Sequence, residues 1–365
     1  MKRHKQANLE LLRILCALMV IAFHMIAQSN ILDNCSIGNY TFAVFFHAGG
    51  RLACSVFVII GAYFLVDIPF HSYRILQLFV KTVITVAVID VALFVFARDT
   101  VQSMSIVELV IQIFPFLGQP YWFVDAYICM LVLSPILNYI VNENRIQNYK
   151  CLLIVLSLCS VVVGSIPLIF KFSPFANDSL WFCFLYILTG ELKHRGIFNI
   201  VSKWTWAFLF IVCYFSACGI CLVCNQLKAN WEYAWILRFF YISTYQSIFA
   251  FIAAISLFGL FLSINISNCK VSSIIEKISA HTFGIFLIHQ VPLLWVNGWI
   301  WNRVFHIQQY AYQPYFPLYC FGVLLICFFI CFCVDVLLEK LYILFNRITK
   351  IPQLAERLDQ YIGVA

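Results

Sequence analysis

The side chains best suited to chemistry lie in the first apolar segment of the chain, where Arg13 and His24 interrupt a hydrophobic run. A separation of eleven residues on an α-helix returns both side chains to nearly the same face, roughly 16 Å apart along the axis. Ionisable groups inside a membrane span are costly and are functional candidates by default. The spacing therefore predicts a catalytic pair, unless Arg13 extends to the lipid headgroups and His24 is a packed core residue.

The composition indicates a multispan membrane protein. Of the 365 residues, 63% are hydrophobic and 11% are charged, and the mean hydropathy is +0.93. These values exclude a soluble globular chain. The formal net charge of +7 gives only a weak indication of nucleic-acid binding, and we expect no nucleic-acid partner. The sixteen cysteines are scattered through apolar runs, which favours packing over disulfide bonds, and we expect no metal site.

Ten apolar runs are long enough to cross about 30 Å of hydrocarbon. They cover residues 9–28, 44–66, 74–97, 121–141, 151–171, 179–193, 204–226, 239–264, 281–301 and 315–337. The sequence therefore predicts an all-α, polytopic membrane helix bundle of about ten transmembrane helices. We expect residues 1–340 to form the integral-membrane domain and residues 341–365 to form a short, loose cytoplasmic tail.

The distribution of lysine and arginine predicts the orientation of the bundle. An even number of spans places both termini on one side, and fifteen basic residues fall in the segments on that side. Only five fall on the other side: Arg98, Lys171, Lys228, Arg238 and Arg303. Because cytoplasmic segments carry the excess of basic residues, we expect both termini in the cytoplasm. Arg13 would then lie near the cytoplasmic face, and His24 would lie past the midplane toward the outer surface.

Basic residues of the second and third spans are candidates for substrate binding. Arg51 stands within the second span, and His71 and Arg74 precede the third. His71 and Arg74 at the cytoplasmic end of a helix could bind the phosphates of a donor such as coenzyme A. The alternative is that they are ordinary positive-inside anchors, and a snorkelling side chain explains Arg51 almost as well.

Three further candidates lie in the fourth and ninth spans. Trp122 opens the fourth span and could form an aromatic shelf for a sugar ring, although aromatic residues are common at any membrane boundary. Asp125 follows in the same span and could orient an imidazole, as carboxylates do for catalytic histidines. His289 lies within the ninth span, where it is either functional or packed.

Four ordered stretches resemble the acyltransferase family 3 integral-membrane proteins. The first is Glu10, Arg13 and His24 in the opening span, which is similar to the signature of that family. The others are the second span from Arg51 to Phe64, the Trp-Phe entry and Ser134-Pro135-x-x-Asn138 exit of the fourth span, and the Ser279 to His289 stretch. Gly61 and Ala62 stand where the family commonly has Ser and Gly, and Phe286 replaces its commoner Tyr.

The resemblance implies a membrane-bound O-acyltransferase in the inner (plasma) membrane of a bacterium. Its donor substrate would be acetyl-CoA or another acyl-CoA, with no bound cofactor, and its acceptor a hydroxyl of a lipid-linked or surface polysaccharide. His24 would act as general base or covalent acyl carrier, with Arg13 and Arg74 at a cytoplasmic donor site. Glu10 belongs to the same signature and is included with the substrate-binding residues.

The alternative function is a transporter or flippase for a lipid-linked sugar, in which the intramembrane charges line a pathway. Such proteins commonly contain two related halves, and the sequence shows no repeat of hydropathy or motif. Consumption of an acyl donor distinguishes the two functions.

Overall fold

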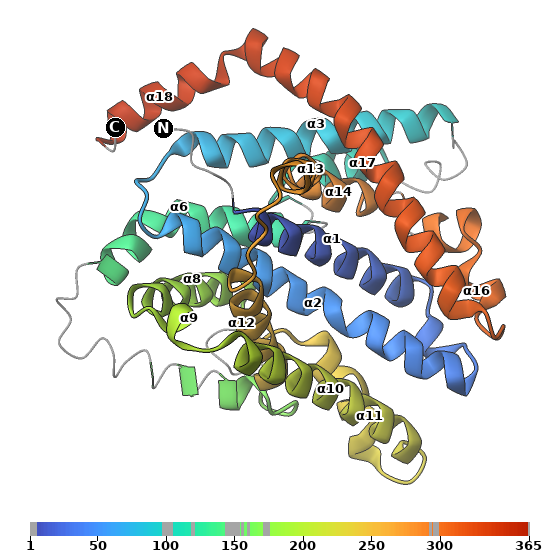
Figure 1. The fold of residues 1–365 in the computed structure, drawn as a ribbon. Helices are drawn as coiled ribbons and strands as arrows, with labels where there is room; N and C mark the ends of the chain where they lie inside the picture. The colour runs from blue at the N-terminus through green and yellow to red at the C-terminus, as the bar shows by residue number, and fades with distance from the viewer. Residues whose placement is uncertain are drawn as a thin grey trace.

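The computed structural model describes residues 6–96, 105–117, 121–142, 154, 157–158, 161–170, 176–291, 294 and 299–363. Every regular element in these residues is a helix (Figure 1). Eight candidate membrane spans occur among them. They are α1 (Ala7–Gln28), α2 (Ile37–Leu65), α3 (Ser72–Phe96), α6 (Trp122–Asn142), α10 (Lys203–Leu227), α11 and α12 (Glu232–Ser243 and Ile248–Leu262), α13 and α14 (Cys269–Ser279 and Thr282–His289), and α17 (Phe316–Thr349). The chain is a polytopic helical membrane protein.

Two of the ten expected spans are not among these eight. The expected span at residues 179–193 corresponds to α8 (Asp178–His194), which has 17 residues, fewer than the about 20 that a span normally needs. The expected span at residues 151–171 is described only in part, at residues 154, 157–158 and 161–170. Short helices occupy the connections: α5 (Ile106–Ile113), α9 (Ile197–Ile200) and α16 (Ile307–Tyr310).

The ninth span differs from the prediction of residues 281–301. It begins at Cys269, breaks between α13 and α14, and the second helix ends at His289. The side chain of Asn268 accepts hydrogen bonds from the N–H groups of Lys270 and Val271, and this cap starts α13 earlier than hydropathy indicates. The polar residues of α13 hide this half of the span from a search for apolar runs.

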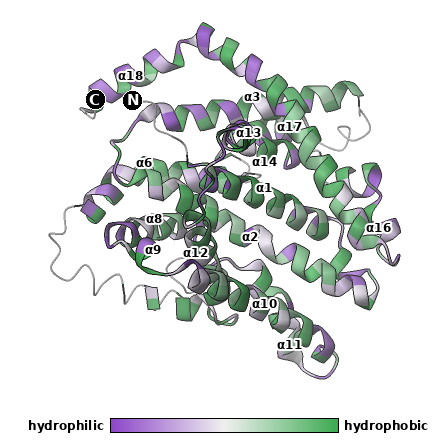
Figure 2. Ribbon diagram, in the orientation of Figure 1, coloured by the Kyte–Doolittle hydropathy of each residue, from purple (hydrophilic) through white to green (hydrophobic). Residues whose placement is uncertain are grey.

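The helices α1 and α2 form the centre of the bundle (Figure 1). They pack closely because Gly50 faces Phe23, and a Cβ at this position would lie 2.1 Å from the Cβ of Phe23. The helix α1 also contacts α12, α13, α14 and α17. Figure 2 shows mainly hydrophobic residues along the long helices, as expected for spans that face either lipid or one another.

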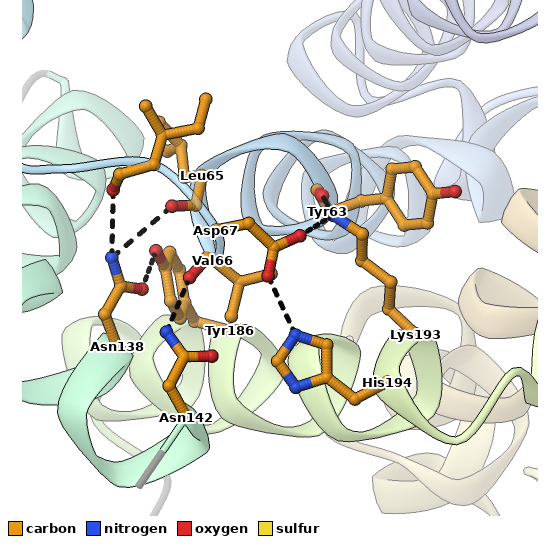
Figure 3. A network of polar contacts seen from close by, with 10 residues as sticks. Tyr63, Leu65, Val66, Asp67, Asn138, Asn142, Tyr186, Lys193 and His194 are labelled. Carbon is orange, nitrogen blue, oxygen red and sulfur yellow. Dashed lines mark hydrogen bonds and ion pairs between the residues drawn. The ribbon is translucent and has the colours of Figure 1, made fainter.

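The end of α2 is held by two asparagines of α6 (Figure 3). The Nδ2 group of Asn138 donates to the carbonyls of Leu65 at 3.4 Å and Ile68 at 3.2 Å, and that of Asn142 donates to Val66 at 3.2 Å. The carbonyls of Leu65 and Val66 lie at the C-terminal end of α2, where no helical N–H follows to bond them, and Ile68 lies in the turn after it. The Ser-Pro-x-x-Asn exit of the fourth span therefore has a structural explanation, because its Asn caps a neighbouring helix.

The end of α8 lies beside the same turn. Lys193 donates to the carbonyl of Tyr63 at 2.6 Å and pairs with Asp67, whose other oxygen lies 2.8 Å from Nε2 of His194 (Figure 3). Partial burial raises the pKa of Asp67, but the bonds to Lys193 and His194 outweigh it and leave the pKa below its usual value. We call this end of the bundle, which also holds the start of α1, the Arg13 end.

The residues after position 340 are helical, where the sequence predicts a loose tail. The helix α17 continues to Thr349, and α18 (Ile351–Ile362) then packs against α3 (Figure 1). Asp359 accepts a hydrogen bond from the backbone N–H of Ser72 at 2.9 Å and lies 3.5 Å from Nδ1 of His71. The candidate residue His71 is therefore engaged with the C-terminal helix.

Candidate active site

A cavity of about 290 Å³ lies between α1, α2, α3, α6 and the break between α13 and α14. Its polar lining is supplied by Glu10, Arg13, Tyr127, Ser279 and Thr282. Apolar side chains supply the rest, among them Val20, Phe57, Leu78, Phe123 and Phe286. A largely apolar pocket with a few convergent polar groups is the usual form of a small-molecule site.

A three-residue cluster orients Arg13 at the wall of this cavity. Its Nη1 atom lies 3.0 Å from Oε1 and 3.2 Å from Oε2 of Glu10, and Glu10 also accepts a hydrogen bond from the hydroxyl of Ser279. Glu10 is buried, whereas the side chain of Arg13 is 30% exposed. A guanidinium has five N–H donors, so Arg13 held in this way still has donors to offer an anionic ligand.

His24 and His289 meet across the bundle, from α1 and α14. The Nδ1 atom of His24 lies 3.1 Å from Nε2 of His289, and Nδ1 of His289 lies 2.6 Å from the carbonyl oxygen of Ile285. A carbonyl only accepts, so Nδ1 of His289 carries hydrogen and its Nε2 is the acceptor when the ring is neutral. It follows that Nδ1 of His24 is the donor and that Nε2 of neutral His24 keeps a free lone pair.

The cavity extends from Arg13 toward the two histidines, but neither imidazole belongs to its lining. Val20 lines it and lies one helical turn before His24. Phe286 also lines it, and its ring centroid lies 6.2 Å from that of His289. The sequence predicted that Arg13 and His24 share one side of α1, and the structure places a cavity along that side.

His47 and Arg51, both on α2, complete the surroundings of His24. The ring of Phe23 packs against the rings of His24 and His47, with centroid distances of 5.1 Å and 4.5 Å. The guanidinium of Arg51 lies 4.6 Å from the ring centroid of Trp122 and within electrostatic range of the His24 imidazole. The candidates Arg51 and Trp122 therefore belong to one group beside His24.

Sequence reasoning missed His47 and Ser279 as members of the site. His47 is buried, and its Nδ1 atom has no hydrogen-bond partner in the described part of the chain. The available signal was an ionisable residue four positions before Arg51, on the same side of a helix. Ser279 contacts Glu10 from a distant part of the sequence, so no local pattern could have revealed that bond.

Other candidates lie away from the histidines. A carboxylate oxygen of Asp125 accepts a hydrogen bond from the N–H of Phe116 at 3.0 Å, and among the described residues no histidine contacts Asp125. Arg74 donates to the carbonyl of Pro69 at 3.3 Å and lies within electrostatic range of Tyr127, a cavity residue. Arg74 is thus near the Arg13 end of the cavity.

Comparison with known families supplies an independent result. The chain matches the model described as an acyltransferase domain, of acyltransferase family 3, over residues 6–332. No curated protein and no solved structure matches the chain. Because the family match covers nearly the whole chain, this protein belongs to acyltransferase family 3 and is a membrane acyltransferase.

Proposed function

We propose that this protein is an O-acyltransferase that moves an acyl group from a cytoplasmic acyl-CoA to a hydroxyl of a lipid-linked or surface polysaccharide. The observation that supports it best is the cavity that runs from Arg13 to Val20 and Phe286, which precede His24 and His289 by about one helical turn. The proposed location is the inner membrane of a bacterium, with the Arg13 end and both termini in the cytoplasm. Acetyl-CoA is the proposed donor.

The Arg13 end is suited to the donor. Arg13 lines a largely apolar cavity, and Arg74 lies within electrostatic range of Tyr127, another lining residue. Guanidinium groups bind phosphate with several hydrogen bonds. The nucleotide phosphates would stay at this end while the thioester arm enters the cavity. The apolar walls would exclude water, which protects the thioester from hydrolysis.

His24 is the proposed general base. Its Nε2 lone pair accepts the proton of the acceptor hydroxyl while the hydroxyl oxygen attacks the thioester carbonyl carbon. Collapse of the intermediate breaks the carbon–sulfur bond, and the proton held by His24 passes to the leaving thiolate. His289 is a positioning residue in this scheme, because its Nε2 holds the Nδ1–H of His24.

The acceptor would approach from the side of Trp122. The Trp122 and Tyr245 rings are stacked, with centroids 5.8 Å apart and an interplanar angle of 7°. Aromatic surfaces of this kind suit the apolar faces of a sugar ring, and they lie beside the group that contains Arg51 and His24.

Transfer of radiolabel tests the proposed function. Membranes containing the protein are incubated with acetyl-CoA labelled in the acetyl group, and label is counted in the glycolipid and polysaccharide fractions. Label transferred above that of membranes without the protein supports the proposal. If the acetyl-CoA is not consumed but a lipid-linked sugar crosses the membrane faster, the protein is a flippase and the proposal is wrong.

A further inference from the structure

Arg51 is a cation in the middle of the most buried span. It lies fourteen residues before Leu65, about 21 Å along α2 from the end that Asn138 caps. Both ends of α2 are therefore far away, and the side chain cannot reach either one. A guanidinium at this depth is costly unless a partner compensates it.

Aromatic rings surround the guanidinium of Arg51. Its Cζ atom lies 4.6 Å from the ring centroid of Trp122, 5.7 Å from that of Tyr245 and 5.9 Å from that of Phe23. The hydroxyl of Tyr245 donates to Asp178, which fixes the position of that ring. Cation–π contacts stabilise the charge, but ring faces do not replace oxygen acceptors for the five N–H groups.

No hydrogen bond or ion pair joins Arg51 to any other residue in the described ranges. Arg238 provides the contrast within this chain. Its side chain is 2% exposed, and it donates to Asp33 at 3.0 Å, to the carbonyl of Leu32 at 2.7 Å and to Tyr40 at 3.2 Å. Arg238 is thus a structural arginine with satisfied donors. Arg51 is held by rings, with the Asp178 carboxylate within electrostatic range, and among the described residues no group accepts a hydrogen bond from it.

An acyl transfer beside His24 creates an anion close to this guanidinium. When the hydroxyl oxygen bonds to the carbonyl carbon, the π electrons of the carbonyl move to its oxygen and form an oxyanion. The proton of the hydroxyl goes to Nε2 of His24, so the oxyanion is the negative charge that develops. Preformed donors aimed at such a charge in a dry site are usually the largest source of catalysis.

We propose that Arg51 stabilises the oxyanion of the tetrahedral intermediate through its free N–H donors. The inference rests on the proposed acyl transfer. When the intermediate collapses, the electron pair returns to the carbonyl and the thiolate leaves, taking the proton from His24. The aromatic rings keep the guanidinium in place between turnovers without competing for its hydrogen bonds.

Steady-state kinetics of two Arg51 variants test the assignment. Arg51→Gln should lower kcat by about 10²- to 10³-fold, the loss typical for one oxyanion donor. The KM values for acyl-CoA and for the acceptor should change little, since the interaction exists only in the transition state. Arg51→Lys should fall between wild type and Arg51→Gln, because it keeps the charge but loses the fork of donors.

Thermal unfolding separates catalysis from folding. Arg238→Gln should lower the unfolding temperature because it breaks three hydrogen bonds, whereas Arg51→Gln should unfold close to wild type. A raised KM for the acceptor with an unchanged kcat would show that Arg51 binds an anionic acceptor in the ground state, which would overturn the oxyanion assignment but leave acyl transfer standing. If the wild type transfers no acyl group, the proposed function and the assignment are both wrong.

Discussion

Replacing His289 should disturb His24, the proposed base, while leaving the His24 side chain itself unchanged. In His289→Ala, the Nδ1–H of His24 loses the acceptor that lies 3.1 Å away. Leaving a buried donor unpaired costs about 1–3 kcal/mol, and each 1.36 kcal/mol off transition-state stabilisation changes the rate about tenfold. We therefore expect kcat to fall by about 5- to 150-fold in the label-transfer assay, while the KM for acetyl-CoA stays near the wild-type value.

A second variant, His289→Gln, tests whether the lost hydrogen-bond acceptor is the cause. His289→Gln supplies a side-chain oxygen that can accept from His24, so it should recover most of the activity that His289→Ala loses. His306→Ala is the matched control, since His306 is exposed and its bond is to the neighbouring Gln309. If His289→Ala keeps full kcat, or if the Gln and Ala variants lose the same activity, then His289 does not position His24.

Three further outcomes follow from single contacts. Gly61→Ala places a Cβ 2.3 Å from the Tyr127 hydroxyl, a cavity group, and overpacking of about 1–3 kcal/mol should raise the KM for acetyl-CoA about fivefold or more. Gly284→Ala places a Cβ 1.8 Å from Oδ1 of the buried Asp335, so unfolding in detergent should occur several degrees lower. The lowered pKa of Asp67 gives stability that is complete above its unfolded value of about 3.9 and is lost as pH falls through the lower folded value. The unfolding temperature should drop less steeply below pH 4 in Asp67→Asn than in wild type.

The two glycine predictions share one control. Gly322 on α17 has nothing within 4 Å of the position of a Cβ, so Gly322→Ala should leave both the KM and the unfolding temperature unchanged. If Gly61→Ala or Gly284→Ala behaves like this control, the corresponding close contact does not constrain the protein.

The fold class and the shared side of α1 on which Arg13 and His24 lie could be predicted from the sequence, because both depend on local patterns. Long apolar runs identify membrane helices, and helical periodicity places Arg13 and His24 on one side of α1. The break between α13 and α14 was missed because α13 is polar on one side and does not register as an apolar run. The helical tail was missed because its bonds to Ser72 and His71 join distant parts of the chain.

The residues of the site were only partly predictable, because the contacts that bring them together join distant parts of the chain. His24 and His289 were both candidates, but their contact is between residues 265 positions apart and no spacing rule links them. Asp125 had the right chemistry for orienting an imidazole, yet its carboxylate caps the N–H of Phe116. Arg51 was a substrate-binding candidate that a snorkelling side chain explained almost as well, and its aromatic neighbours come from distant parts of the chain.

The most direct measurement is acetyl transfer by wild type and His24→Asn at matched membrane expression. Asparagine keeps a polar side chain of similar reach but cannot take up a proton near neutral pH. We predict that wild-type membranes move label from acetyl-CoA into glycolipid or polysaccharide and that His24→Asn lowers kcat by at least about 10²-fold. Transfer by His24→Asn at the wild-type rate would contradict the account of the active site.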